Sequence, residues 1–535
     1  MFSGKIKLIL FALFPFVLSA QDVPQWTIFE DVRQAARDYE NPLQDLSAEV
    51  VFTAPSGRTT VVPAFWDYNR DWRVRFSPDE LGSWRYQWRT SDASSQLGGH
   101  SGSMRCVPYQ GGNSLYRHGA VAVAQGGRHF THADGRPFFW LGDTAWNGVL
   151  LSAEADWEVY LRDRVRKRFS VIQFVALPWR SASGNLHGRP AFYGRDKVAI
   201  DPIFFQQMDD RVEAINREGL LAAIVMFWTH STHVDLNPGM LLPEDQLIVL
   251  GRYLIARYGA YHTTWLLGGD GAYVGERADR WRRVGQALFG EKAPGIRRPV
   301  TMHATYWCAD AFASESWWDF NGYQSGHDRV RGLERVTQGE PTAFWQNDSR
   351  PVLNLEPNYE AHRNRAPNAE PSDVFDALDV RRQAWLSLLS APPAGLTYGA
   401  HGIWGWHPRA EEPMTHPYTG IGPAWRDAMD LEGSHNLRVL AELFADLDWT
   451  SLRPAQALLA RQPGETDVKR WVAIAQGSGF ALAYTADGEP IELRQKVRAA
   501  RWHSPRTGEV VDAKAGDTTF TPPSKKDWVL WLGLP

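Results

Sequence analysis

The chain has 535 residues, more than one hydrophobic core usually supports, and we expect roughly two to four domains. Its 57 basic and 61 acidic residues nearly balance, which argues against nucleic acid or another polyanion as a partner. The chain is rich in aromatic rings, with 25 Trp, 17 Tyr and 25 Phe, and such rings either fill a large core or stack on the faces of sugars.

The first 20 residues resemble a secretory signal peptide. Two lysines precede the apolar run LILFALFPFVL, and cleavage is expected after Ala20. We therefore expect a periplasmic or secreted protein, and no later run of about 20 apolar residues predicts a membrane span. The two cysteines, Cys106 and Cys308, could pair or stay as buried thiols, and the sequence leaves this open.

Residues 21–110 predict an N-terminal antiparallel β-sandwich. Apolar and polar residues alternate in AEVVFTAP, TTVVPAFW, WRVRFSP and SWRYQW, and the turn sequences SGR, YNRD and DELG separate them. We expect this domain to support its neighbour and not to bind a ligand of its own.

Residues 111–449 change to a repeated strand–helix pattern. The candidate strands are PFFWLGD, VIQFVALPW, LAAIVMFW, TTWLLGGD, PVTMHATY, FNGYQSG, PVLNLEP and GLTYGAHGIW. Helical periodicity is clear in FQQMDDRVEAINREG, PEDQLIVLGRYLIARYG and DVFDALDVRRQAWLSLLS. Eight such units predict a closed (β/α)8 TIM barrel, although no clear helix is visible between Tyr306 and Phe320.

Residues 450–535 return to short strands and predict a second, C-terminal antiparallel β-sandwich. The strand-like segments are RWVAIAQ, FALAYTA, RAARWHS, TTFTPP and DWVLWLGL, with the turn sequences ADGEP and SPRTGE. Because no Ser/Pro-rich linker separates the three regions, we expect them to pack against one another.

In a (β/α)8 barrel the active site lies at the C-terminal ends of the strands, and acids, histidines and indoles gather there in this sequence. Three of the residues at these strand ends are acids, namely Asp143, Asp270 and Glu356. Hydrolysis of a glycosidic bond needs two carboxyl groups with different pKa values. Tyr323, in YQSGH, could donate a hydrogen bond to a neighbouring nucleophile and keep it ionised. The strand-end residues are Asp143, Trp146, Trp179, Arg180, Trp228, His230, Asp270, His303, Tyr306, Tyr323, Gln324, His327, Asn354, Glu356, His401 and Trp404.

Each acid also has a purely structural interpretation. Asp143 could cap a turn, Asp270 could belong to a Gly-Gly-Asp turn, and Glu356 could pair with an arginine. No histidine pair has the spacing of a zinc site, so we expect no catalytic metal. The sequence also lacks a nucleophile elbow, a P-loop and a dinucleotide fingerprint in the right context, so we expect no cofactor.

The segments FFWLGDTAW, WLLGGD and NLEPNYE resemble motifs of the apiosidase-like (β/α)8-barrel glycoside hydrolases. The resemblance covers most of residues 113–447. The N-terminal region, with RVRFSP and GSWRY, is similar to the small β-sandwich that often precedes this barrel. The C-terminal region, with RWHSPRTGE and DWVLWL, resembles a β-sandwich labelled for collagen binding, from which we do not infer that activity.

The resemblance implies a role for each acid. Asp270 would be the general acid/base and Glu356 the nucleophile, while Asp143 and Trp146 would bind the sugar next to the scissile bond. Related retaining barrels usually carry Asn-Glu at the end of strand 4, where this chain has Gly-Asp. The full set of expected substrate-binding residues is Asp143, Trp146, Trp179, Trp228, His303, Tyr323, Gln324, His327, His401 and Trp404.

The sequence therefore predicts a secreted glycoside hydrolase that cleaves a plant or algal polysaccharide or oligosaccharide with retention of configuration. Its partner would be a carbohydrate substrate, and the oligomeric state is open. The alternatives are a carbohydrate-binding or scaffolding protein without catalysis and a polysaccharide lyase with Tyr306 or Tyr323 as its base. Both acids of the pair are present, which favours the hydrolase.

Overall fold

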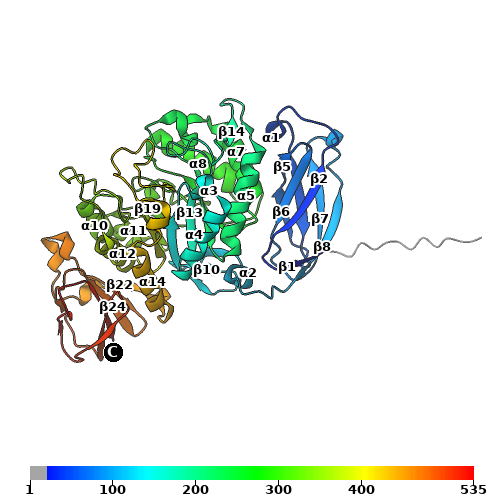
Figure 1. The fold of residues 1–535 in the computed structure, drawn as a ribbon. Helices are drawn as coiled ribbons and strands as arrows, with labels where there is room; N and C mark the ends of the chain where they lie inside the picture. Colours follow the sequence, from blue (N-terminus) through cyan, green and yellow to red (C-terminus); the bar gives the residue numbers. More distant parts are fainter. Residues whose placement is uncertain (1–20, 535) are drawn as a thin grey trace, which may run out of the picture.

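The computed structural model describes residues 21–534, which form a central domain flanked by two domains rich in β-sheet (Figure 1). The N-terminal domain, blue in Figure 1, and the C-terminal domain, orange to red, lie on opposite sides of the central domain. The expected signal peptide, residues 1–20, lies outside the described residues. Within residues 21–534, no helix is both long and apolar enough to cross a membrane.

The N-terminal domain consists of two sheets that enclose one core. Buried residues alternate with half-buried ones along β3 and with exposed ones along β7, so one face of the sheet turns inward. In the core, the rings of Phe52 and Phe76 stack 4.1 Å apart. One sheet has the order β1 (Gln21–Pro24), β8 (Ser101–Val107), β7 (Gly82–Thr90), β3 (Ala48–Thr53) and β4 (Thr59–Pro63). The other has the order β2 (Phe29–Gln34), β6 (Asp71–Phe76) and β5 (Phe65–Tyr68), and α1 (Pro42–Asp45) follows β2.

All eight expected strands of the central domain form and run parallel. Every residue of these strands is buried, as expected for strands covered on both faces. Six strands form one sheet in the order β18 (Val300–Thr301), β17 (Thr263–Gly268), β16 (Leu221–Phe227), β13 (Val171–Val175), β12 (Trp140–Thr144) and β21 (Gly395–Gly399). The other two, β19 (Asn321–Gln324) and β20 (Val352–Glu356), pair in a separate sheet.

Helices alternate with these strands along the chain (Figure 1). The segment after Tyr306, where the sequence shows no clear helix, contains only one helical turn, α9 (Ala309–Phe312). The remaining helices are α2 (Ser114–His118), α3 (Gly148–Leu151), α4 (Glu154–Arg166), α5 (Pro202–Arg217), α6 (Pro238–Leu241), α7 (Glu244–Tyr258), α8 (Gly275–Phe289), α10 (Arg329–Gln338), α11 (Glu340–Asn347), α12 (Ala377–Ser390), α13 (Trp425–Ala428) and α14 (Glu432–Ala445). The short strands are β9 (Val121–Val123), β10 (Phe130–His132), β11 (Pro137–Phe138), β14 (Phe192–Tyr193) and β15 (Ala199–Ile200).

The two parallel sheets lie side by side at both edges. At one edge, the backbone N–H of Gly322 in β19 donates to the Thr301 hydroxyl at the end of β18 (3.1 Å). At the other edge, the N–H of Glu360 donates to the Gly399 carbonyl of β21 (2.9 Å). Regular strand pairing joins six strands in one sheet and two in the other, so it is not continuous around all eight.

The C-terminal domain is a six-stranded antiparallel sheet with a two-stranded sheet beside it. The larger sheet has the order β22 (Arg453–Pro454), β23 (Ala473–Gly477), β24 (Phe480–Thr485), β29 (Trp528–Gly533), β26 (Ala499–His503) and β27 (Val510–Ala513). The smaller one pairs β25 (Ile491–Glu492) with β28 (Thr519–Phe520).

Buried ion pairs join the flanking domains to the central one. Arg257 of α7 pairs with Asp67 of the N-terminal domain (2.8 Å), and Arg381 of α12 pairs with Asp527 of the C-terminal domain (2.7 Å). Cys106 and Cys308 are free, buried thiols in different domains, which settles the question that the sequence left open.

Candidate active site

Asp270 follows two glycines at the end of β17. A Cβ atom on Gly269 would lie 2.4 Å from the Trp228 indole, and one on Gly268 would lie 2.2 Å from the Tyr273 hydroxyl. The glycines are therefore required because side chains of the protein pack against this backbone.

Glu356 enters the same region through an irregularity in the β19–β20 ladder. Tyr323 pairs with Asn354, but the next residue, Gln324, pairs with Glu356, so β20 has one extra residue at this point. Strict alternation along β20 would place Glu356 on the face of Asn354, whose amide bonds to Ser387 of α12. The bulge instead turns Glu356 toward His303 and His327, as bulges next to active sites often do.

The two acids predicted to be catalytic face each other. One carboxylate oxygen of Asp270, one ring nitrogen of His303 and one carboxylate oxygen of Glu356 all lie within 4.8 Å of one another. The side chains of Asp270 and Glu356 are 16% and 10% exposed, so both are reached by solvent but largely enclosed. The structure therefore brings together residues that are 86 positions apart in the chain (356 minus 270).

A single amide connects Asp270 to His303. The Nε2 of Gln324 donates to Asp270 Oδ1 (2.6 Å) and lies 3.1 Å from His303 Nδ1. Because the amide N–H is a donor, Nδ1 is the acceptor and the proton of the neutral ring sits on Nε2. That Nε2 faces Glu356 Oε2 at 3.4 Å. Within the described residues, no protein group donates to Asp270 Oδ2, which remains free for proton transfer.

Two imidazoles hold Glu356 as a carboxylate. His327 Nε2 donates to Glu356 Oε1 (3.0 Å), and His303 lies next to Oε2. Burial by itself would raise the pKa of the Glu356 carboxyl, but the His303 and His327 rings outweigh burial and hold this pKa well below its usual value. Glu356 is therefore ionised at neutral pH, as a nucleophile must be.

Tyr359 is a member of the site that the sequence did not single out. Its hydroxyl is buried, and its ring contacts His327 edge-on at 4.7 Å. Burial and then the Glu356 charge raise the pKa of Tyr359 well above its usual value, so its hydroxyl stays protonated at neutral pH. Its position three residues after Glu356, in the segment NLEPNYE, was the signal available in the sequence.

The predicted indoles form a continuous wall beside the carboxylates. Trp146 lies edge-on to His303 at 4.8 Å, and Trp228 lies 5.7 Å from Trp146 and 4.2 Å from Trp179. These three indoles are only 1–3% exposed, so they offer little ring surface for stacking on a sugar. They pack against one another beside the acids, and the buried Trp228 N–H has no hydrogen-bond partner among the described residues.

His401 and Trp404 extend this wall at the end of β21. The Trp404 N–H donates to His401 Nδ1 (3.0 Å), so the opposite nitrogen carries the proton and donates to the Gly420 carbonyl (2.8 Å). Burial lowers the pKa of His401 to about 4, and the ring is neutral at pH 7. His401 therefore fixes Trp404 and the loop at residue 420 and makes no contact with either acid among its hydrogen bonds.

Several buried donors around the two acids lack a partner in the described part of the chain. Buried polar atoms without hydrogen bonds are uncommon in proteins, and a group of them around one hollow suggests that a ligand completes them. Sugars carry many hydroxyl oxygens that accept such bonds. The unpartnered donors are Arg180 Nε, Trp228 Nε1, His303 Nε2 and the Tyr359 hydroxyl. His327 Nδ1 is also unpartnered and is an acceptor, because Nε2 of that ring donates to Glu356.

Asp143 lies apart from Asp270 and Glu356. It is fully buried, pairs with Arg164 of α4, and accepts a hydrogen bond from the Tyr160 hydroxyl (2.7 Å). Its side chain therefore points away from the two acids, into the layer between β12 and α4, whereas the hydroxyl of the next residue, Thr144, accepts from Gln173. The prediction that Asp143 binds the sugar does not fit this placement, because adjacent strand residues face opposite sides.

Tyr323 does not fit its predicted role either. Its side chain is buried on the side of β19 that faces Ser387 of α12, and burial raises the pKa of its hydroxyl. The hydroxyl therefore cannot reach Glu356 as a donor. The neighbouring residue, Gln324, occupies the site face of β19 instead.

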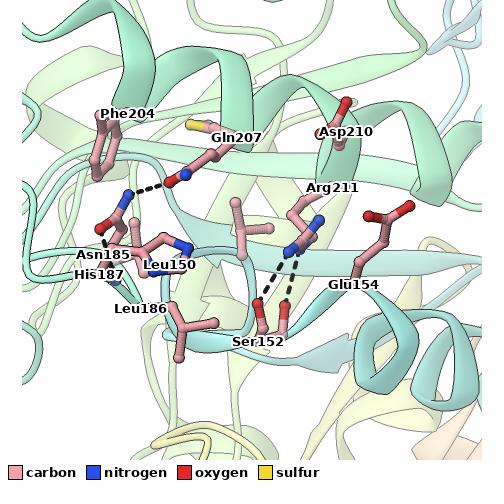
Figure 2. Close-up of a pocket in the computed structure, with 12 residues that line it drawn as sticks. Leu150, Ser152, Glu154, Asn185, Leu186, His187, Phe204, Gln207, Asp210 and Arg211 are labelled. Carbon is pink, nitrogen blue, oxygen red and sulfur yellow. Dashed lines mark hydrogen bonds between the residues drawn. The ribbon is translucent and has the colours of Figure 1, made fainter.

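The atoms of Asp270, His303 and Glu356 are also close enough to one another to hold a metal ion. The sequence expectation of no catalytic metal stays a prediction. A separate cavity of about 210 Å³ lies between α3 and α5, lined by Leu150, Asn185, Gln207 and Arg211 among others (Figure 2). None of the predicted site residues lines this cavity.

Three family descriptions match different parts of this chain. Residues 124–451 match the family described as "Apiosidase-like, catalytic domain". The chain belongs to the apiosidase-like family. Residues 22–91 match a domain of unknown function (DUF5060), and residues 454–533 match a domain named for collagen binding in a collagenase. A search of curated proteins finds no match to this sequence.

Solved structures of glycoside hydrolases share the fold of this apiosidase-like protein. One is 24% identical, covers 78% of this chain and 98% of its own, and has a TM-score of 0.66. Another, a family 5 glycoside hydrolase from Bacteroides vulgatus, is 21% identical, covers 78% of this chain and 93% of its own, and has a TM-score of 0.67. Family and fold together support a glycoside hydrolase.

Proposed function

We propose that this glycoside hydrolase is a retaining enzyme in which Asp270 is the general acid/base and Glu356 is the nucleophile. The observation that carries the proposal is that one carboxylate oxygen of Asp270 lies within 4.8 Å of one carboxylate oxygen of Glu356. Retaining enzymes place the two carboxyl groups about 5–5.5 Å apart, whereas inverting enzymes leave about 6.5 Å or more for a water molecule.

In the first step, Glu356 Oε2 or Oε1 attacks the anomeric carbon, and the bond from that carbon to the leaving oxygen breaks. Asp270 gives its proton to the leaving oxygen, so the aglycone departs as an alcohol. The products are a glycosyl ester on Glu356 and an ionised Asp270. Gln324 stabilises the Asp270 carboxylate through its hydrogen bond to Oδ1.

In the second step, Asp270 takes a proton from water, and the water oxygen attacks the anomeric carbon. The ester bond breaks, and Glu356 returns to the carboxylate form that His303 and His327 stabilise. Two displacements at the same carbon restore the original anomeric configuration.

We also propose that the six-stranded and two-stranded sheets together close the (β/α)8 barrel that the sequence predicts. The hydrogen bonds of Gly322 and Glu360 across the two open edges support this. Closure is what would bring the ends of β17 and β20 together over one hollow. An experimental structure that separates these edges would contradict it.

For location and substrate, we propose an exported enzyme that acts on a plant or algal glycan. The charged start, apolar run and Ala20 of the sequence support export. N-terminal sequencing of the protein recovered from the periplasm or medium tests this, with cleavage near Ala20 as the expected result. The unpartnered donors around the acids support a substrate rich in hydroxyl oxygens.

The decisive experiment compares Glu356→Gln with Asp270→Asn on pectic, arabinan and algal glycans and on aryl glycosides. We expect Glu356→Gln to lose about 10³-fold or more of kcat on every substrate. Asp270→Asn should lose about 10²–10⁴-fold on glycans but keep activity on aryl glycosides, whose leaving groups need no proton. Glu334→Gln, at an exposed position on α10, is the matched control.

Three outcomes would contradict the proposal. Equal losses in both variants on an aryl glycoside would contradict the two roles, and a first product with inverted configuration, observed by NMR, would contradict retention. Unchanged glycan release by Glu356→Gln would show that Glu356 is not the nucleophile. Glycan binding without any release would favour the non-catalytic alternative, and an unsaturated uronate product would favour a lyase.

A further inference from the structure

The bulge in β20 consists of one extra residue, Leu355. Asn354 and Glu356 pair with successive residues of β19, so the ladder passes over Leu355. Leu355 is fully buried, and a bulged residue is left without its ladder hydrogen bonds. Its backbone must therefore be satisfied from outside the ladder, because an unpaired buried carbonyl is costly.

Gln173 of β13 satisfies that carbonyl. Its Nε2 donates to the Leu355 carbonyl (2.8 Å) and to the Thr144 hydroxyl (3.0 Å). β13 and β20 belong to different sheets and share no ladder, so this side chain links the bulged residue to the six-stranded sheet. Gln173 is fully buried, and its Oε1 has no hydrogen-bond partner among residues 21–534. A buried acceptor without a partner lowers stability, so stability alone does not explain an amide at this position.

Asn354 holds the residue position before the bulge on the side of α12. Its Nδ2 donates to the hydroxyls of Ser325 (2.8 Å) and Ser387 (3.1 Å), and its Oδ1 accepts from the Ser325 N–H (3.3 Å). That N–H also donates to the Glu356 carbonyl (3.0 Å). Ser325, which follows β19, is therefore bonded to both residues that flank Leu355.

Two side-chain amides thus fix the bulge from two directions. We propose that Gln173 and Asn354 are positioning residues that hold the bulge and thereby aim the Glu356 carboxylate at the anomeric carbon. The inference rests on the proposed function, in which Glu356 is the nucleophile. In the described part of the chain, neither amide is hydrogen-bonded to the carboxylate of Glu356 or Asp270, so both act through the backbone of β20.

Loss of either amide should let β20 relax toward regular alternation. Regular alternation would turn Glu356 away from His303 and His327, because neighbouring positions on a strand face opposite sides. A displacement of about 1 Å at a reacting group can lower the rate about 10²-fold, whereas the groups that bind the substrate stay in place. We therefore expect a loss in kcat and little change in KM.

The test uses the full chain with three separate substitutions. Gln173→Met keeps the length of the side chain but removes its N–H groups, and Asn354→Asp keeps the shape but leaves a carboxylate that only accepts. Asn216→Asp is the matched control, because the buried Asn216 amide also donates to two acceptors, the carbonyls of Leu220 and His262. Those carbonyls precede β16 and β17, at the ends of the strands opposite to the two acids.

Kinetics are measured on the p-nitrophenyl glycoside that the wild-type enzyme cleaves fastest, at a temperature where circular dichroism shows each variant to be folded. Gln173→Met and Asn354→Asp should each lower kcat about 10²-fold, with KM within about threefold of the wild type. Asn216→Asp should lower the melting temperature but leave kcat within about twofold. A double variant of the two positioning residues should lose less than the product of the single losses, because one bulge relaxes only once.

The pH profile separates positioning from a general loss of stability. His303 and His327 hold the pKa of the Glu356 carboxyl below its usual value only while the carboxylate faces them. In both positioning variants this pKa should rise, so the acid limb of the kcat/KM profile should move to higher pH. Asn216→Asp should leave that limb in place.

Unchanged kcat and an unchanged acid limb in the folded variants would overturn the inference, as would an equal loss of kcat in Asn216→Asp. Losses that multiply in the double variant would contradict a shared bulge. If either positioning variant does not fold, Ser387→Ala removes one acceptor of the Asn354 amide and should lower kcat by a smaller factor; an unchanged kcat there would overturn the inference. A fully active Glu356→Gln would refute the proposed function, whereas an inactive Glu356→Gln beside fully active positioning variants would refute only this inference.

Discussion

Two regions of the central domain bury carboxylates in opposite ways. At the outer face of β12, Asp143 is paired with Arg164 and bonded to Tyr160, and no part of it is exposed. At the ends of β17 and β20, Asp270 and Glu356 have only an amide and two imidazoles as close partners, and both side chains remain partly exposed.

This difference separates a structural carboxylate from a reactive one. An arginine neutralises Asp143 permanently, because a guanidinium does not lose its proton. Histidine and glutamine stabilise a carboxylate by hydrogen bonds but leave it able to attack or to exchange a proton. The first acid of the FFWLGDTAW motif is therefore part of the framework, and the chemistry lies with the other two.

The largest expected effect is on stability and follows from substituting Asp143, the structural carboxylate of this comparison. Asp143→Asn leaves the Arg164 charge buried with only Asp163 as an acidic partner (2.9 Å). We expect a loss of about 3 kcal/mol or more in the free energy of unfolding, seen as a fall of about 5 °C or more in melting temperature. Asp270→Asn is the matched control and should lower the melting temperature little. Equal shifts in the two variants would contradict the distinction.

The next effect concerns the neutral histidines around the site. His401 accepts from Trp404 only when it is neutral, and its folded pKa of about 4 lies below the unfolded value of about 6.5. The stability that neutral His401 contributes to the folded state is therefore complete above about pH 6.5 and is lost as the pH falls through about 4. The loss amounts to at most about 3 kcal/mol.

Melting temperatures measured from pH 7 to pH 4 check this. His401→Gln should make the melting temperature fall less steeply as the pH falls, because the unfolded chain then has one histidine fewer that takes up a proton. Half-buried His416, whose pKa is lowered to about 3, should keep part of the slope. Parallel curves for the variant and the wild type would show that His401 does not contribute.

A smaller effect on catalysis should follow when His303 loses the hydrogen bond that fixes its tautomer. Gln324→Leu removes the donor to both Asp270 and His303 Nδ1, so the ring is free to move its proton away from Glu356. We expect kcat to fall about 10-fold with KM little changed, and the pH profile of kcat to shift. Gln324→Glu should not restore it, since a carboxylate accepts. An unaltered pH profile would assign Gln324 a packing role only.

The smallest expected effect is that of chelation. Although Asp270, His303 and Glu356 lie within metal-binding distance of one another, the proposed mechanism uses no metal. Dialysis against EDTA should leave kcat/KM on an aryl glycoside within about twofold of the untreated enzyme. A loss that zinc or calcium restores would show that the three residues hold a metal ion.

Much of the fold could be predicted from the sequence. The apolar strand segments, their turn residues and the helical periodicity gave all eight central strands, and the missing helix after Tyr306 is a single turn, α9. Asp270 and Glu356 were identifiable because each follows a buried apolar strand. These features are local, and side-chain period and turn chemistry determine them within a few residues.

The face of the sheet toward which a strand-end side chain points was not predictable. Asp143 and Thr144 are neighbours, as are Tyr323 and Gln324, and in each pair only one member lies on the site face. A shift of one residue exchanges the two faces. The sequence selected the wrong member of the first pair, and for the second it named both.

The sequence by itself determined which segments become strands and helices, where strands end, and which acids stand at those ends. Only the tertiary structure decided that Glu356 reaches the site, because a bulge in β20 depends on pairing with β19 and not on the residues of β20 alone. It also decided that Asp143 meets Arg164 whereas Arg180 meets no acid within ion-pair distance. Charge pairing is set by distance across elements that lie far apart in the chain.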